Sequence, residues 1–196
     1  YAVLAGSAVR NTGATSVFGN LGVNPGTEVS GFPPGTVSGE IHIGDAEALQ
    51  AWYDARAAYN DIANRTQYQN IVGTGELGGL TLVPGLYKTG SANLLITSED
   101  LTLDAQGNSE AIWIFQSPSA LIVQSNRRVV LTGGARAENV FWAVNGSVTL
   151  GGSSLFKGNL LLLLGPATLQ DNAILDGRVL VRNGDVILNT NTVTKP

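Results

Sequence analysis

The 196-residue chain fits a single domain over residues 1–196 that buries a substantial core. A formal net charge of −4 argues against a nucleic-acid partner, and the absence of cysteine excludes disulfides, thiolate metal sites and cysteine nucleophiles. With 13% charged residues, 43% hydrophobic residues and 25 glycines, the composition predicts a tightly turned, strand-rich protein.

The N-terminal part of the chain predicts short strands and turns. Because the chain begins at Tyr1 without a methionine, we expect a secreted protein whose signal peptide has been removed. Loose strand patterns cover residues 1–12 and 16–23, with a turn signal between them. Pro33 and Pro34 stiffen the following loop, which we interpret as a cap or a crossover.

Residues 45–64 predict one long α-helix. Asp45 is a suitable N-cap, and one stripe at helical spacing holds Leu49, Trp52, Tyr59, Ile62 and Ala63. Twenty residues give a rod of about 30 Å, which is close to the height of six β-coils stacked about 4.8 Å apart. We therefore expect about six coils, with the helix inserted between the N-terminal and C-terminal coils and packed along the stack.

One short strand recurs from residue 94 onward. Its central residues follow each other at steps of 27, 27, 19 and 19, and they are Leu95, Ile122, Thr149, Thr168 and Ile187. Both neighbours of each central residue are apolar, which predicts that the neighbours point inward and the central residue outward. A second strand type precedes the first by eight residues, and a third short strand closes each coil. Three strand types per coil predict a three-sided β-solenoid.

The three sides of this solenoid differ in character. The second strand type is apolar on both faces; we expect Ile114, Phe141, Leu160 and Val179 inside, and Trp113, Phe115, Val140, Trp142, Leu161 and Leu180 outside, beneath the helix. The side that precedes it carries Phe18, Lys157 and Asp176, and is therefore mixed and charged. The side with the recurring strand remains largely uncharged.

The uncharged side is the candidate binding surface. We align residues 8–10 with residues 149–151, so that Ala8 joins the first outward row. A second row then holds Arg10, Thr97, Gln124, Gly151, Gln170 and Asn189, and a third holds Thr12, Glu99, Asn126, Ser153, Asn172 and Asn191. Such a plane of hydroxyl, amide and aliphatic groups suits a rigid crystalline partner such as ice. The open alternatives are an ordinary solvent-facing sheet rich in Thr and a carbohydrate-binding or adhesion surface.

Catalytic and cofactor sites find little support in the sequence. Residues 73–78 match the G-x-G-x-x-G pattern of dinucleotide sites, but a strand and a turn follow where such a site needs a helix. Asp171 and Asp176 are the closest candidates for a carboxylate pair, and we favour solvated turns for both. His42 is assigned a structural role. We therefore expect no enzyme, no cofactor and no metal ion. The longest apolar run, residues 160–164, is too short for a membrane span.

The sequence resembles the bacterial and fungal ice-binding proteins of the DUF3494 family. The matching segments run in family order over essentially the whole chain: residues 1–7, 11–13, 19–26, 31–37, 57–61, 78–82, 84–88, 101–107, 139–142, 156–159 and 177–178. The resemblance implies a right-handed, discontinuous β-solenoid of triangular section with one long helix against it. It also implies secretion and ice binding through one flat face, with thermal hysteresis and inhibition of ice recrystallisation.

The family resemblance also adds a motif near the candidate surface. Several members carry T-A/G-x-T/N, which residues 12–15 of this chain fit and the later coils fit poorly. We therefore expect a monomeric, non-enzymatic protein that binds the ice surface. The residues predicted to do so are Ala8, Arg10, Thr12, Thr15, Leu95, Thr97, Ile122, Gln124, Thr149, Gly151, Ser153, Thr168, Gln170, Ile187, Asn189 and Asn191.

Overall fold

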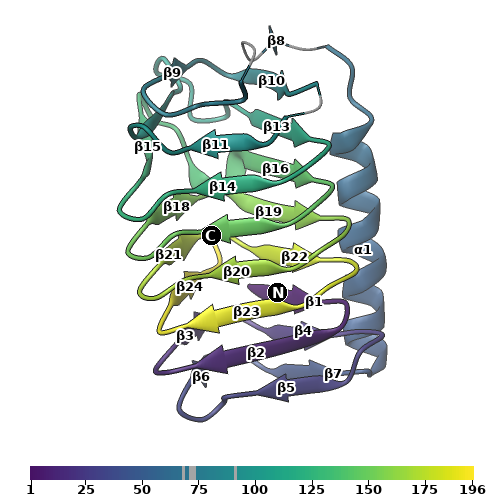
Figure 1. Ribbon diagram of the computed structural model, residues 1–196. Coiled ribbons are helices and arrows are strands. Elements are labelled where there is room, and N and C mark those ends of the chain that lie inside the picture. The colour runs from purple at the N-terminus through teal and green to yellow at the C-terminus, as the bar shows by residue number, and fades with distance from the viewer. Residues whose placement is uncertain (68, 71–73, 91) are drawn as a thin grey trace.

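The protein is a stack of β-coils with one helix along its outside (Figure 1). The computed structural model describes residues 1–67, 69–70, 74–90 and 92–196. Its strands form parallel sheets, and each sheet collects one strand from each successive coil. The arrangement confirms the predicted fold class, a mainly β solenoid with a single long helix in the described part of the chain.

One side of the stack is a nine-stranded sheet that we call the helix side, because α1 (Ala46–Ala63) packs on it. Its strands, in spatial order, are β7 (Ile41–Ile43), β4 (Leu21–Val23), β1 (Val3–Ala5), β22 (Val179–Val181), β19 (Asn159–Leu162), β16 (Val140–Val144), β13 (Trp113–Ser117), β10 (Gly85–Lys88) and β8 (Gln69–Asn70).

A second side is a continuous seven-stranded sheet, which we call the open side because no helix packs on it in the described structure. It faces the viewer in Figure 1. Its strands, in spatial order, are β11 (Leu94–Ile96), β14 (Leu121–Val123), β17 (Val148–Leu150), β20 (Ala167–Leu169), β23 (Val186–Asn189), β2 (Ala8–Thr12) and β5 (Glu28–Ser30).

The third side is interrupted, and we call it the split side. Three strands form its first part: β15 (Val129–Thr132), β12 (Leu101–Asp104) and β9 (Thr81–Leu82). Five form its second part: β18 (Leu155–Lys157), β21 (Ile174–Asp176), β24 (Thr192–Thr194), β3 (Ser16–Phe18) and β6 (Thr36–Val37). An isolated bridge between Arg128 and Leu155 links the two parts. A 3₁₀ turn at Ala137–Asn139 leads from this side into β16.

The coils do not follow one another in chain order. β1, β2 and β3 pair with β22, β23 and β24, so the N-terminal coils lie beneath the last C-terminal coil. From β7 at the base, α1 carries the chain along the stack to about the level of β13, and winding resumes above its end (Figure 1). Its 18 residues span about 27 Å. The N-terminal and C-terminal strands of the chain therefore pair with each other within the same three sheets.

The helix begins and packs largely as the sequence predicts. The Asp45 carboxylate accepts a hydrogen bond of 2.8 Å from the Ala48 amide, and Tyr59 and Ile62 are buried against the sheet. The Trp52 indole nitrogen donates to the Arg182 carbonyl at 2.9 Å. The prediction for Leu49 is wrong, since it is 41% exposed and Ala48 is the buried residue of the first turn. No helix in the described residues has the length and apolar character that a bilayer crossing requires.

On the helix side, the prediction of which side chains point into the core is wrong for two strands, β13 and β16. Leu160 pairs with Trp142 rather than Phe141, so Leu160 and Val179 point inward as predicted, whereas Ile114 and Phe141 face the helix. The predicted outward side chains of Trp113, Phe115, Val140 and Trp142 are instead in the core. Both faces of these strands are apolar, and alternation therefore gave no signal for the correct frame.

Candidate functional site on the open side

The middle row of the open side is aligned as the sequence predicts. Leu95, Ile122, Thr149, Thr168 and Ile187 pair one after another across five neighbouring strands. In each strand the residues before and after the central one are buried, so the central side chain points out of the sheet. The five side chains therefore form an uncharged row with one residue about every 4.8 Å.

The row continues into β2 in a different frame from the one predicted. Arg10 pairs with Ile187, while Ala8 lies two residues earlier, opposite Glu28, and is only 2% exposed. The prediction that Ala8 lies on the surface row is therefore wrong. The cause is Asn11, a polar residue at an inward position that normally holds an aliphatic side chain. Its amide nitrogen is satisfied by the carbonyls of Gly13 at 2.9 Å and Gly31 at 2.8 Å.

Arg10 marks the charged end of the open side. Its guanidinium forms ion pairs with Asp185 and with Glu28, the latter at 2.6 Å. All three side chains are partly or largely exposed, so the cluster contributes little to stability. Its consequence is spatial, because the uncharged row ends where this cluster begins.

A second outward row lies two residues after the first along each strand. Thr12 pairs with Asn189 and thus belongs to this row, together with Thr97, Gln124, Gly151 and Gln170. Gln124, Gln170 and Thr12 are exposed. Gly151 is buried, so the prediction that it lies on the surface is wrong, and a Cβ atom there would lie 2.4 Å from the Ser125 amide nitrogen, so only glycine fits. The second row is therefore polar, with one position that has no side chain.

The turn after the second row repeats a left-handed residue in successive coils. Asn126, Ser153, Asn172 and Thr190 have φ values of 62°, 56°, 58° and 53°. Ser153 is exposed, as predicted, but Thr190 and not Asn191 occupies this place in the last coil. Asn191 is 2% exposed, and its amide donates to the carbonyls of Gln170 and Ala173. The prediction for Asn191 applies the 19-residue step of the middle row, from Thr168 to Ile187. The left-handed turn residue instead moves by 18 residues, from Asn172 to Thr190, and the prediction is therefore wrong.

Thr15 also lies inside the protein. It is 0% exposed, and its hydroxyl accepts a hydrogen bond of 3.0 Å from the Asn191 amide. Of the two threonines in the motif at residues 12–15, Thr12 alone is exposed. The prediction of Thr15 as a surface residue is therefore wrong, because the chain has already turned inward toward β3.

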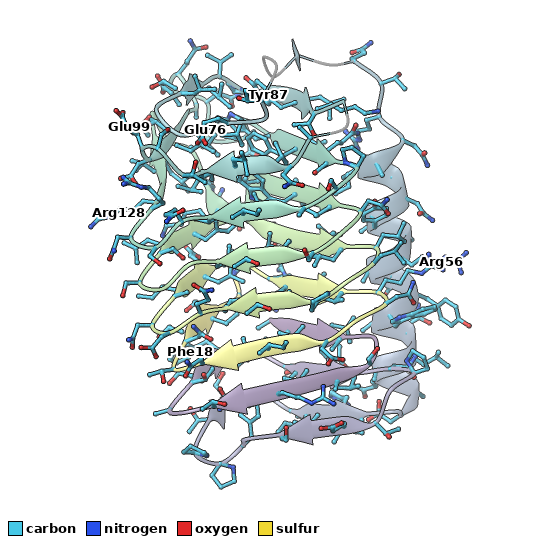
Figure 2. The ribbon with its side chains drawn as sticks, in the orientation of Figure 1. Phe18, Arg56, Glu76, Tyr87, Glu99 and Arg128 are labelled. Atoms are coloured by element: carbon cyan, nitrogen blue, oxygen red, sulfur yellow. The ribbon has the colours of Figure 1, made fainter. Side chains whose placement is uncertain are left out.

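Glu76, to which no pattern in the sequence points, completes the opposite end of the open side. It bridges to Leu95, and its carboxylate accepts hydrogen bonds from the Thr97 hydroxyl and, at 2.9 Å, from the Thr97 amide. Figure 2 shows it above β11, at the same end of the molecule as Glu99. Glu76 is part of the glycine-rich match, whose first residue, Gly73, lies outside the described residues. The match thus contains a side chain that caps the end of a sheet.

The Glu76 contacts predict a pH-dependent stability of this end. Partial burial alone would raise the pKa of Glu76, but hydrogen bonds from Thr97, Gly78 and Ser98 outweigh it and lower that pKa. A lowered pKa in the folded state means that the stabilisation is present near neutral pH and is lost as the pH falls through the folded pKa. In thermal unfolding from pH 6 to pH 3, the stability advantage of wild type over Glu76→Gln should shrink. A constant difference would contradict this expectation.

The other two sides are poorer candidates for a flat contact. The helix side is covered by α1, whose outer surface carries Arg56, pointing away from the sheets in Figure 2. The split side is interrupted, and it bears an ion pair of 2.8 Å between Lys157 and Asp176 in the same row as the half-exposed Phe18. Because Asp176 is held by Lys157 and Asp171 by the Asn172 amide, the candidate carboxylate pair is engaged in structural contacts.

Related proteins have the same fold. The most similar structures compared include an ice-binding protein from an Antarctic biological consortium, with a TM-score of 0.96, 46% identity and coverage of 100% of this chain and 87% of that one. Another is the ice-binding protein of the Antarctic ascomycete Antarctomyces psychrotrophicus, with a TM-score of 0.93 and 38% identity, covering 100% of this chain and 94% of that one.

Sequence comparison gives the same relationship. An ice-binding protein of Nostoc sp. (strain HG1) is 41% identical over 195 residues, which cover 99% of this chain and 71% of that protein. One from Flavobacterium frigoris (strain PS1) is 35% identical over 209 residues, covering 100% of this chain and 74% of that protein. The family model described as ice-binding-like matches residues 3–194. The chain belongs to the ice-binding-like family.

Proposed function

We propose that this protein binds ice through the open side. The observation that carries the proposal is the middle row from Leu95 to Ile187, which stays in register across five strands without a charged residue. The family relationship supports ice as the partner. The surface residues that we assign to the contact are Arg10, Thr12, Leu95, Thr97, Ile122, Gln124, Thr149, Ser153, Thr168, Gln170, Ile187 and Asn189.

The chemistry of these rows suits a partner made of ordered water. Aliphatic groups such as those of Ile122 and Ile187 form no hydrogen bonds to water, and the water layer next to them becomes ordered. The hydroxyls of Thr149 and Thr168 lie beside these groups and anchor the ordered water by hydrogen bonds. The Thr97 hydroxyl is already bound to Glu76 and is the least available of the three. Charged groups, which organise water around themselves, stand at the Arg10 end of the sheet.

Adsorption to ice would produce both thermal hysteresis and inhibition of ice recrystallisation. Ice that grows between adsorbed molecules becomes convex, which lowers its local freezing point and separates freezing from melting temperature. The same pinned surfaces slow the transfer of water from small to large crystals. We propose a non-enzymatic monomer that acts outside the cell, where it can reach ice.

Nanolitre osmometry on the wild-type chain tests the proposal. At micromolar protein we expect faceted crystals, a gap between melting and freezing temperature, and inhibited recrystallisation in a frozen sucrose film. A glycan array run in parallel tests the alternative of a carbohydrate-binding solenoid. Unhindered crystal growth together with specific glycan binding would overturn the proposal in favour of that alternative.

A further inference from the structure

A second cluster of polar side chains lies at the base of the stack, where β7 leads into α1. His42 is the central residue of β7 and pairs with Gly22 of β4. Gly44, with φ of 61°, makes the left-handed turn that brings the helix N-cap Asp45 back toward the strand. The Asp45 carboxylate contacts His42 Nδ1 at 2.9 Å with one oxygen and caps the Ala48 amide with the other. The imidazole is thus fixed in position by the start of the helix.

The other nitrogen of this imidazole is unsatisfied. The His42 side chain is only 8% exposed, and its Nε2 has no hydrogen-bond partner among the described residues. Oε2 of Glu40 and Oε2 of Glu47 each lie 3.3 Å from Nε2, which is ion-pair distance for a protonated imidazole but not hydrogen-bond geometry. A buried imidazole nitrogen without a partner is costly, so this one calls for a ligand.

The spacing of these atoms fits a metal ion. In a tetrahedral zinc site with bonds of about 2.0–2.1 Å, neighbouring ligand atoms lie about 3.3–3.4 Å apart. His42 Nε2 has this separation from both carboxylates, and the ligand atoms of Glu40, His42 and Glu47 all lie within 4.8 Å of one another. The two glutamate side chains are 78% and 72% exposed, so they can close around an ion that enters from solvent.

The surroundings favour a cation as well. Glu40, Asp45 and Glu47 place three carboxylates around one imidazole. The Tyr1 ring lies edge-on to His42, with 5.6 Å between the ring centroids. An Asp carboxylate that holds Nδ1–H leaves the Nε2 lone pair free to bind a metal, an arrangement common to histidine ligands.

We propose that Glu40, His42 and Glu47 bind one Zn²⁺ ion, with Asp45 as the residue that positions the imidazole. The remaining coordination position is open to water, as in three-ligand zinc sites. The ion joins the edge strand of the helix side to the first turn of α1. This site lies on a different side of the stack from the open side, so we expect zinc binding to leave ice binding unchanged.

Isothermal titration of the metal-free full-length chain with zinc chloride tests the proposal. The protein must carry no histidine tag, because His42 is the only histidine in the sequence. We expect one zinc per chain and a melting temperature raised by about 5–10 °C at free zinc about 100 times Kd. Because the chain has one imidazole, its NMR signals report directly on the ligand atom, and zinc should shift the Nε2 resonance.

Variants separate the ligands from general acidity. Glu47→Gln should weaken zinc binding by more than about 100-fold, and Asp45→Asn, which keeps an N-cap, by about 10–100-fold. Asp54→Asn on the exposed face of α1 is the matched control and should bind as wild type does. Circular dichroism verifies that each variant is folded. The proposal is overturned if the wild type does not bind zinc, which would mean that hydrogen bonds and ion pairs alone hold the imidazole. Unchanged zinc binding in Glu47→Gln would overturn it as well.

Discussion

Replacing Thr149 by Tyr will remove about half or more of the thermal hysteresis, because binding to a flat surface depends on shape complementarity. Thr149 is the middle residue of the uncharged row, with Ile122 and Thr168 beside it. A phenol ring there stands above its neighbours and separates the sheet from an ice plane. The position is only partly buried and lies on a strand, where Tyr is well tolerated, so the protein should remain folded. Nanolitre osmometry and thermal unfolding measure the two effects.

The chain offers a closely matched control for this substitution. Thr102 on the split side has the same setting as Thr149, with a buried aliphatic residue before and after it in a strand. Thr102→Tyr should therefore leave the thermal hysteresis at the wild-type level. If both variants lose hysteresis equally, the open side is not the contact surface. If neither variant loses it, the contact lies elsewhere on the protein.

Replacing Trp142 by Ala will destabilise the protein by about 3–5 kcal/mol, the range for large aromatic residues in cores. Trp142 is fully buried in a column of rings, 4.0 Å from Phe115 and 4.9 Å from Phe156 between ring centroids. Its indole nitrogen also donates to the Lys157 carbonyl at 3.1 Å. The substitution removes the stacking and leaves a cavity that neighbouring coils cannot fill, because their strands are fixed by hydrogen bonds on both edges. Urea unfolding curves measure the change.

Trp142→Phe separates packing from hydrogen bonding. It keeps a ring in the column and removes the indole donor, so the loss of stability should be clearly smaller than for Ala. A loss below about 1 kcal/mol for Trp142→Ala would contradict the expectation that packing in this column of rings stabilises the core.

Much of the fold follows from patterns that the sequence states directly. The helix is visible because a capping Asp45 precedes residues at helical spacing, and the middle row is visible because Thr149 and Thr168 each lie between two apolar residues. The frame of Ile114 and Phe141 was not predictable, since apolar side chains cover both faces of their strands. There the helix, and not alternation, decides which face points outward.

Which residues face outward at the lower end of the candidate surface could be determined only from the structure. Val9 is the first inward residue of β2, but the second is Asn11, and this exchange shifted the expected position of Ala8 by two residues. Asn191 and Thr15 look like surface residues in the sequence, and both are buried because they bond to backbone groups inside the coil. Short polar side chains that satisfy the backbone are indistinguishable in sequence from those that face solvent.

The order of the coils has a consequence for how the protein folds and unfolds. Val3 pairs with Val179 at a sequence separation of 176 residues, and such non-local pairing makes folding slow. Both ends of the chain lie at mid-height in the stack (Figure 1). β1 is flanked by β22 and β4, and β24 by β21 and β3. β1 and β24 can therefore each leave the stack only by breaking two ladders, which should protect both strands from local opening and proteolysis.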